Sequence, residues 1–370
     1  SIKTHMDEAW EALADPNIRV VAQVAPAVRV AVGDHYGLTK GKSVMGKIVN
    51  ALHRMGFDEI YDTSFSADLT IMEESAEFLK RVENGENLPL LTSCCPAWVK
   101  FITDQYKDYI PNLSTCRSPQ GMMSAVIKEY FRDPENAKGK RTVMVSVMPC
   151  TAKKFEITRD DECGAGVPDV DIVITTNELA KMLKDAEIQL EAMNPNAKFD
   201  VPLGIGTGAA VIFGVTGGVM EAALRTAVET LTGQDAVVEY TTVRGMNGIK
   251  EASVDVNGTT VKVAVVSGLA NANQLLTAIK NGTADYQFVE VMACPGGCVN
   301  GGGQPHQDAA TRVMNDVPKM RGAALYRNDA GSAIRKSHEN PVVKEVYESF
   351  LGEPGSEKAN ELLHTSYRMR

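Results

Sequence analysis

Short, continuously apolar segments alternate with helix-like segments along most of the sequence. The segments at 142–150, 170–176 and 261–268 carry few polar residues between their branched apolar ones. A strand of this kind is buried on both faces, as in a parallel sheet with helices on either side. A single core seldom grows beyond about 250–300 residues, so a chain of 370 residues is expected to divide. The sequence therefore predicts an α/β fold of two lobes, each a mainly parallel β-sheet flanked by helices.

The same patterns place the individual elements. Proline cannot continue an interior ladder, so the β-rich run at 18–32 is expected to break at Pro26. We expect the other strands at 59–65, 88–95, 142–150, 170–176, 237–245, 261–268 and 288–294, and helices at 43–55, 67–83, 97–106, 177–186 and 217–231. The polar linker at 133–141 suggests lobes at about 1–132 and 142–304, followed by a C-terminal helical segment at 305–370.

Composition excludes several classes of protein. The formal charge of −9 argues against broad nucleic-acid binding. No apolar run approaches the roughly 18 residues of a membrane-spanning helix, and no basic-then-apolar leader opens the chain. Because the first residue is serine, we expect a chain that was processed or taken from something longer.

The seven cysteines are too sparse for a disulfide scaffold, and three predicted strands end in one. In open α/β sheets, ligands bind outside the carboxyl ends of the strands. The pattern therefore aims four or five thiols at one region from distant parts of the chain. These cysteines follow the strands at 88–95, 142–150 and 288–294: Cys94, Cys95, Cys150, Cys294 and Cys298.

Thiolates favour iron–sulfur clusters, zinc or Cu(I). Zinc sites usually use two close cysteine pairs, whereas only Cys294 and Cys298 are close here. Dispersed ligands fit a cluster held between lobes better than a structural zinc site. The plainest alternative is a set of buried strand-end cysteines that act as small apolar residues. A nicotinamide oxidoreductase is a further alternative because of the glycine-rich run at 204–209, but no clear strand precedes that run.

Three segments resemble the signature segments of the iron-only (FeFe) hydrogenases, in the same order. They are TSCCPAW at 92–98, MPCTAKKFE at 148–156 and EVMACPGGCVNGGGQP at 290–305. The resemblance covers essentially the whole chain. It implies a catalytic domain that interconverts H2 with protons and electrons at a cluster between the lobes. That cluster would be a 4Fe–4S cubane joined to a two-iron unit with CO, cyanide and azadithiolate ligands.

The resemblance also assigns residues. The cubane ligands would be Cys95, Cys150, Cys294 and Cys298, the last of which would also bridge to the two-iron unit. Cys94 would be a free thiol that exchanges protons with the bridging amine. The proton route would continue through Glu74, Ser114 and Glu77, with Arg81 near its exit. Without the resemblance, the charges of this helix face would be read as a solvated stripe.

The remaining assignments concern the wall around the two-iron unit. By resemblance, Lys153 binds a cyanide ligand, and the other wall residues are Met148, Met292, Pro26, Ala27, Pro119, Gln120 and Phe213. Some relatives have serine at the position of Ala27 and histidine at that of Pro295, and such changes retune a cluster through its surroundings. Cys116 and Cys163 receive no role.

Two questions of partner and class stay open. No CxxCxxCxxxCP motif occurs, so electrons are expected from a ferredoxin-type protein or from an accessory iron–sulfur domain or subunit. Maturation proteins would deliver the two-iron unit. An iron–sulfur assembly factor or hydrogen sensor is the alternative within the family, but it would be expected to lose Cys94 or the relay acids. Unpaired thiols favour the cytoplasm, with periplasmic export through a partner's signal as the alternative.

Overall fold

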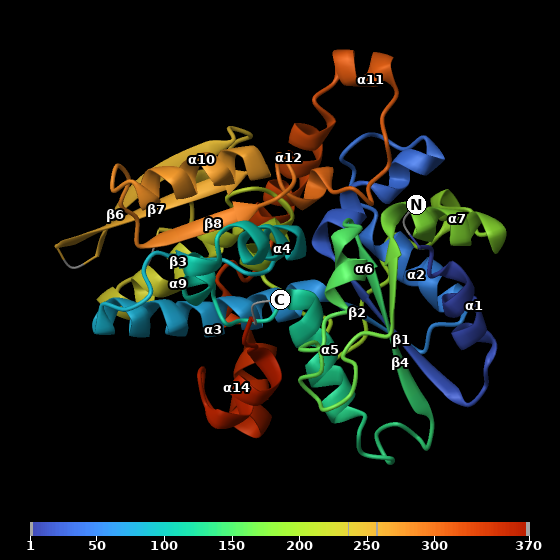
Figure 1. The fold of residues 1–370 in the computed structure, drawn as a ribbon. Coiled ribbons are helices and arrows are strands. Elements are labelled where there is room, and N and C mark those ends of the chain that lie inside the picture. Colours follow the sequence, from blue (N-terminus) through green and yellow to red (C-terminus); the bar gives the residue numbers. More distant parts are fainter. Residues whose placement is uncertain (1–2, 236, 257, 368–370) are drawn as a thin grey trace.

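Two four-stranded sheets form the framework of the computed structural model, which describes residues 3–235, 237–256 and 258–367 (Figure 1). The first sheet is entirely parallel, in the order β2 (Glu59–Asp62), β1 (Ile18–Val24), β4 (Arg141–Met148) and β5 (Ile172–Thr175). The second has the order β3 (Leu90–Leu91), β8 (Phe288–Met292), β7 (Thr259–Ser267) and β6 (Ile249–Val256), with only the β6–β7 pair antiparallel. This confirms the predicted two-lobed α/β fold.

Helices bury both faces of the first sheet, as its apolar strands require. Val20, Ala22 and Val24 of β1 face a core that includes α1 (Met6–Ala14), α2 (Met45–Met55) and α7 (Thr176–Asp185). Val21 of β1 and Met144 of β4 point the other way, toward α3 (Thr63–Asn84), α5 (Pro119–Tyr130) and α14 (Glu357–Leu363). Successive side chains along each strand point to opposite faces of the sheet, and they therefore pack into two separate cores.

The second sheet is covered in the same manner. Val263 and Val265 pack toward α3 and α9 (Gly218–Thr232), whereas Ala264 and Val266 pack toward α4 (Pro96–Gln105) and α10 (Leu269–Lys280). Helix α3 thus contributes to a core in each lobe. It begins where the Asp62 side chain accepts a hydrogen bond from the Ser64 N–H, and it ends at left-handed Gly85. This helix is the structural link between the lobes.

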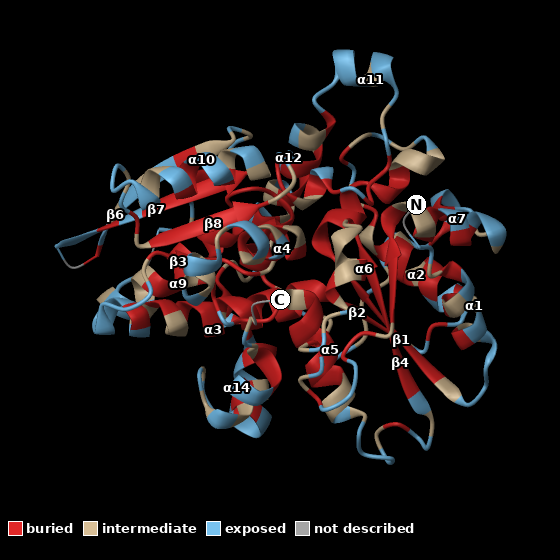
Figure 2. Cartoon of the chain, in the orientation of Figure 1, coloured by how far each residue is buried: buried red, intermediate tan, exposed pale blue. Residues whose placement is uncertain are grey.

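The C-terminal segment consists of helices, as expected. Helices α12 (Val317–Ala330), α13 (Pro341–Val346) and α14 return to the two lobes, whereas α11 (Ala309–Met314) stands out from the molecule with no buried residue (Figure 2). None of the described helices combines the length and hydrophobicity that a bilayer-spanning segment requires. The short elements are α6 (Ala152–Glu156), α8 (Gly208–Val211), the 3₁₀ turns Pro26–Val30, Val32–Tyr36, Lys107–Asn112, Leu190–Ala192, Ile212–Gly214, Thr241–Val243, Cys298–Asn300 and Ser337–Glu339, and the π turn Tyr347–Leu351.

The predicted break at Pro26 is confirmed, but the residues after it do not return to a strand, and the strand predicted at 237–245 is wrong. The half of the 18–32 run that follows Pro26 forms 3₁₀ turns, because proline at the first position presets a helical φ. The segment at 237–245 contains only a 3₁₀ turn at Thr241–Val243, and the strand lies later, at β6. β6 is an edge strand with alternating burial, so its polar residues obscured it, whereas 241–242 is exposed and pairs with no strand.

The linker at 133–141 does not separate the two sheets. β3 lies before the linker but pairs in the second sheet, and β4 and β5 lie after it but pair in the first. Parallel neighbours need crossover connections, so the chain passes from one lobe to the other and back. The strands at 59–65 and 88–95 are also shorter than expected, since Asp62 caps α3 and only Leu90–Leu91 pair as a strand.

Candidate active site

A single cavity between the lobes collects the cysteines that follow the strands. Cys94 and Cys95 come after β3, Cys150 after β4, and Cys294 and Cys298 after β8. All five thiols line this cavity, together with a mostly apolar wall. The convergence that the strand ends predicted is therefore observed, although the strands belong to two different sheets.

Contacts around the sulfurs fit the group that these residues would hold. The Ala293 N–H points at Cys95 Sγ, at 3.4 Å, which ties the β3 cysteine to the segment before Cys294. Burial, followed by the neighbouring Cys95 and Cys294, raises the pKa of Cys150 to about 12. Thiols crowded in this way favour a shared cationic ligand that accepts thiolates, and hydrogen bonds to the sulfurs are typical of iron–sulfur sites.

The turn between Cys294 and Cys298 depends on glycine. Gly296 and Gly297 have φ of +82° and +92°. A Cβ on Gly297 would lie 2.6 Å from the Thr216 nitrogen and 2.9 Å from Met292 Sδ. Only glycine fits this conformation and this space, so the CPGGC sequence brings two thiols of one segment to the cavity.

The predicted wall residues all line the same cavity. They are Pro26, Ala27, Pro119, Gln120, Met148, Lys153, Phe213 and Met292. Thr63 and Ala67 of α3 and Gly214 also line it and were missed from the sequence. These three small residues carry no chemical signature, and only the passage of α3 between the lobes brings two of them here.

Lys153 is held by a buried ion pair. Its Nζ donates to the Cys94 carbonyl at 3.1 Å and to both Glu156 oxygens, at 3.0 and 2.9 Å. Burial lowers the pKa of Lys153, but the Glu156 charge outweighs it and the net pKa is raised. Ser118 and Gln120 also donate to Glu156, and the buried Gln120 Oε1 has no partner among the described residues. The cavity wall therefore keeps one fixed ammonium group beside the thiols.

A line of polar side chains leads away from Cys94. Glu74 is 2% exposed, and burial, then the Glu77 charge, raises its pKa to about 8. The Ser114 hydroxyl is close enough to Glu74 to lower its pKa slightly against these two causes, and it donates a hydrogen bond to Glu77 Oε2 at 2.8 Å. The structure thus brings together Cys94, Glu74, Ser114 and Glu77, which we call the relay.

Arg81 follows the relay on α3 and holds its outer end. One guanidinium nitrogen donates to Glu77 Oε1 at 2.6 Å and to the Leu113 carbonyl at 2.7 Å. The other nitrogen donates to three further carbonyls, of Asn87, Pro111 and Asn112, each at 3.1 Å. The charges of this α3 face are therefore partly buried and paired, which excludes the solvated-stripe interpretation.

The two unassigned cysteines lie outside the cavity. Cys116 is fully buried, with its Sγ 3.9 Å from Glu77 Oε2, so it borders the relay. Cys163 is exposed. The glycine-rich run at 204–209 leads into the four-residue helix α8, which begins at Gly208, and follows no strand, so this segment lacks the strand–turn–helix context of a dinucleotide site.

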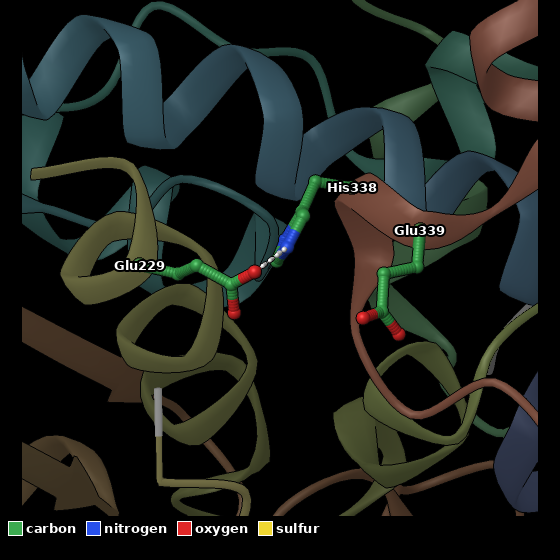
Figure 3. A group of neighbouring side chains, drawn as sticks. All are labelled: Glu229, His338 and Glu339. Carbon is green, nitrogen blue, oxygen red and sulfur yellow. Dashed lines mark ion pairs between the residues drawn. The ribbon is translucent and has the colours of Figure 1, made fainter. Parts of the chain in front are cut away.

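A second group with metal-ligand atoms, among the described residues, lies away from the cysteine cavity. Glu229, His338 and Glu339 place their ligand atoms within 4.8 Å of one another (Figure 3). The Lys336 ammonium already lies 2.5 Å from Glu229 and 3.8 Å from Glu339, and His338 pairs with Glu229 at 3.2 Å. The Lys336 ammonium therefore supplies the positive charge beside these carboxylates that a metal ion would otherwise supply. The ion pairs connect α9 to the turn at Ser337–Glu339.

Two family models together match most of the chain. The model described as "Iron only hydrogenase large subunit, C-terminal domain" matches residues 18–302, and "Iron hydrogenase small subunit" matches residues 315–370. Solved structures of the FeFe hydrogenase HydA1 from Chlamydomonas reinhardtii are 42% identical, with a TM-score of 0.85 and 99% of both chains covered. Related structures are described in terms of an H-cluster and its 2Fe subcluster.

Curated relatives extend this similarity. The NADP-reducing hydrogenase subunit HndD of Solidesulfovibrio fructosivorans is 50% identical over 98% of this chain and 62% of its own length. Iron hydrogenase 1 of Clostridium pasteurianum is 43% identical over 100% of this chain and 64% of its own length. This chain therefore spans less than two thirds of these two relatives. The cytosolic Fe–S cluster assembly factor narfl of Danio rerio is also similar, at 33% identity over 94% of this chain and 86% of its own. The large-subunit model covers well over half of the sequence, and this chain therefore belongs to the iron-only hydrogenase family.

Proposed function

We propose that the chain catalyses the reversible interconversion of H2 with protons and electrons. Cys95, Cys150, Cys294 and Cys298 would hold a 4Fe–4S cubane, and Cys298 would also bridge to a two-iron unit with CO, cyanide and azadithiolate ligands. The observation that carries this proposal is the cavity that five cysteines line, with Cys94 near a buried acid, Glu74, whose Oε2 has no partner among the described residues.

The protein wall defines what each side chain does there. When bound, the two-iron unit supplies an open metal position for H2 and a base beside it. Lys153 presents a fixed ammonium, a good partner for an anionic diatomic ligand. Met148, Met292 and Phe213, with Pro26, Ala27 and Pro119, give the cavity an apolar wall. Gln120 lines the cavity as well, and its buried side-chain amide oxygen has no partner among the described residues.

The relay moves the proton. The pKa of Glu74, about 8, favours the protonated acid at neutral pH, and in that state its hydroxyl would donate toward Ser114 while Ser114 donates to Glu77. All donors then point outward from the cavity. A proton delivered to Glu74 from Cys94 is passed along this line by a shift of each hydrogen to the next oxygen. Arg81 orients Glu77 at the outer end.

Electrons require a partner of their own. We propose a ferredoxin-type protein, or an accessory iron–sulfur domain or subunit, as the electron carrier, and maturation proteins as the source of the two-iron unit. The several unpaired thiols suit a reducing cytoplasm. Periplasmic export through a partner's signal is the alternative, and one relative is described as a periplasmic hydrogenase large subunit.

Iron analysis with infrared spectroscopy of the purified chain under H2 tests the proposal. A hydrogenase should contain well over four irons per chain and show CO and cyanide bands. After supply of the two-iron unit, H2 evolution with an artificial reductant should follow. Zinc in place of iron, or iron with no H2 chemistry once the two-iron unit is loaded, would contradict the proposal.

A cluster-binding assembly factor is the second candidate, because relatives of that description also align along most of the chain. About four irons per chain, with no CO or cyanide bands even after maturation, would favour it. The intact relay of Cys94, Glu74, Ser114 and Glu77 supports the hydrogenase instead, since a protein that only carries a cluster has no use for a buried proton path.

A further inference from the structure

The outer carboxylate of the relay is joined to a histidine near the C-terminal end of the described chain. The Thr115 hydroxyl lies 3.1 Å from Glu77 Oε1 and 2.8 Å from His364 Nδ1. On the other side of the ring, His364 Nε2 lies 2.9 Å from Glu73 Oε2. Hydrogen bonds therefore run without a gap from Glu77 through Thr115 to His364 and Glu73.

Backbone pairing fixes the place of this histidine. The Thr365 N–H donates to the Thr115 carbonyl at 2.7 Å, and the Arg117 N–H donates to the Leu363 carbonyl at 2.8 Å. Cys116 and His364 form an antiparallel bridge between these two bonds. The imidazole is thus positioned by the main chain beside Thr115.

Glu73 sets the orientation of the imidazole. This carboxylate is fully buried and accepts hydrogen bonds from the Tyr347 hydroxyl at 2.5 Å and from the Gly355 N–H at 2.8 Å. As an acceptor, it assigns the hydrogen of the neutral ring to His364 Nε2. His364 Nδ1 then accepts from the Thr115 hydroxyl when the ring is neutral, and donates to it when the ring is charged.

Arg81 cannot pass on the proton that reaches Glu77. A guanidinium does not lose its proton in proteins, and both terminal nitrogens of Arg81 already donate to carbonyls and to Glu77. A proton that leaves Glu77 therefore needs another acceptor. The Thr115 hydroxyl is within reach, and it leads to His364.

His364 and Thr115 also line an open surface pocket. An imidazole there can exchange its proton with water. Several titratable and charged groups surround this path. Glu73 and Glu77 of α3, Tyr347 and Cys116 lie beside His364, Thr115 or their hydrogen-bond partners, and the pocket itself is also lined by Arg117, Asp160, Asp161 and Cys163.

The geometry points to His364 as the residue that carries protons between Glu77 and solvent, an inference that rests on the proposed function. In the outward step, the Glu77 proton moves to the Thr115 oxygen while the Thr115 hydroxyl hydrogen moves to His364 Nδ1. The products are a Glu77 carboxylate, an intact threonine and an imidazolium, which then releases its proton to water. Charge and atoms balance, and the inward step is the reverse.

The first test measures the coupling itself and needs no hydrogen chemistry. The titration of His364 is followed by NMR of the 15N-histidine-labelled chain, which has six histidines, and His364→Gln identifies its signals. Thr115→Val and Glu77→Gln should each shift the His364 midpoint by at least about 0.5 pH unit, whereas Thr115→Ser should leave it in place. An unshifted midpoint in both Thr115→Val and Glu77→Gln overturns the inference.

The second test measures turnover. Thr115→Val and His364→Gln should each lower H2 evolution at least about tenfold and change its pH profile, with iron content and thermal midpoint preserved, and Thr115→Ser should restore the rate. His306→Gln, at an exposed histidine, is the matched control. An unchanged rate and pH profile in Thr115→Val overturns the inference. If the loaded wild-type chain evolves no H2, the proposed function fails, and the NMR coupling still decides whether Glu77 and His364 share a proton path.

Discussion

Glu74 is distinguished from the other acids of the relay by one carboxylate oxygen, Oε2, that is buried without a hydrogen-bond partner. An ionised carboxylate in that position would be costly to bury. The raised pKa resolves this conflict, because the protonated acid carries no charge. The residue is therefore built to hold a proton.

This shift predicts a pH dependence of stability. The pKa of Glu74 rises from its ordinary 4.5 to about 8 on folding, so the folded chain binds the extra proton between these values. Unfolding free energy should then fall as pH rises through this window, by up to about 1.4 kcal/mol per pH unit. Glu74→Gln removes that fall, and urea unfolding between pH 5 and 8 measures it. Exposed Glu83→Gln is the control, and curves for wild type and Glu74→Gln that stay parallel would contradict the prediction.

Cys94 gives the second prediction at this scale. Cys94→Ala should lower turnover at least about 100-fold, because a proton carrier beside the cluster is lost, while the iron content and the cubane spectrum stay unchanged. Iron analysis, electron paramagnetic resonance and H2 evolution measure these quantities. Cys163→Ala, at an exposed thiol outside the cavity, should change none of them. Loss of iron from Cys94→Ala would show that the ligand and proton roles are exchanged.

At the scale of elements, the turns that follow strands carry the chemistry. The CPGGC turn after β8 brings in two thiols because Gly297 adopts φ +92° and approaches Thr216 and Met292 closely. Gly297→Ala should therefore displace this turn and prevent cubane loading, measured as iron per chain. Gly302→Ala is the matched control, since its Cβ would meet only the Thr151 side chain, at 3.3 Å. Full iron loading in Gly297→Ala would contradict this reading of the turn.

Strand ends were predictable from the sequence because they combine an apolar run with a cysteine. That signal located the strands before Cys95, Cys150 and Cys294, and with the motif resemblance it located most of the cavity wall, but not Thr63, Ala67 or Gly214. It failed at 237–245, where a branched apolar run pairs with no strand, and at β6, whose polar face is solvated at the sheet edge. Burial of a strand depends on its neighbours in space, which local sequence does not specify.

At the scale of the whole molecule, the cavity exists only where the two lobes meet. Cys150 follows a strand of the first sheet, while Cys95, Cys294 and Cys298 follow strands of the second. The order of the strands in the sequence could not show this division, because β3, before the polar linker, belongs to the second sheet and β4, after it, belongs to the first. Nor could it show that His364, from the last described segment, reaches the relay, because no motif links it to Thr115.

A bound cluster should therefore act as a clamp between the lobes. Removal of iron by a chelator under reducing conditions should lower the thermal midpoint by roughly 5 °C or more, because a ligand that binds only the folded chain stabilises it. The scanning calorimetry control is Cys150→Ala, which lacks the one ligand from the first sheet and should respond less. An equal midpoint with and without iron in the wild-type chain would contradict the clamp.

The weaving of the chain between the sheets also orders events during protein synthesis. Cys298 emerges from the ribosome some 200 residues after Cys95, and the hydrogen bonds that position His364 form later still. A nascent chain that ends before Cys298 therefore contains only some of the cysteines that line the cavity. A cluster held by Cys95, Cys150, Cys294 and Cys298 would therefore bind only after the segment up to Cys298 has been synthesised.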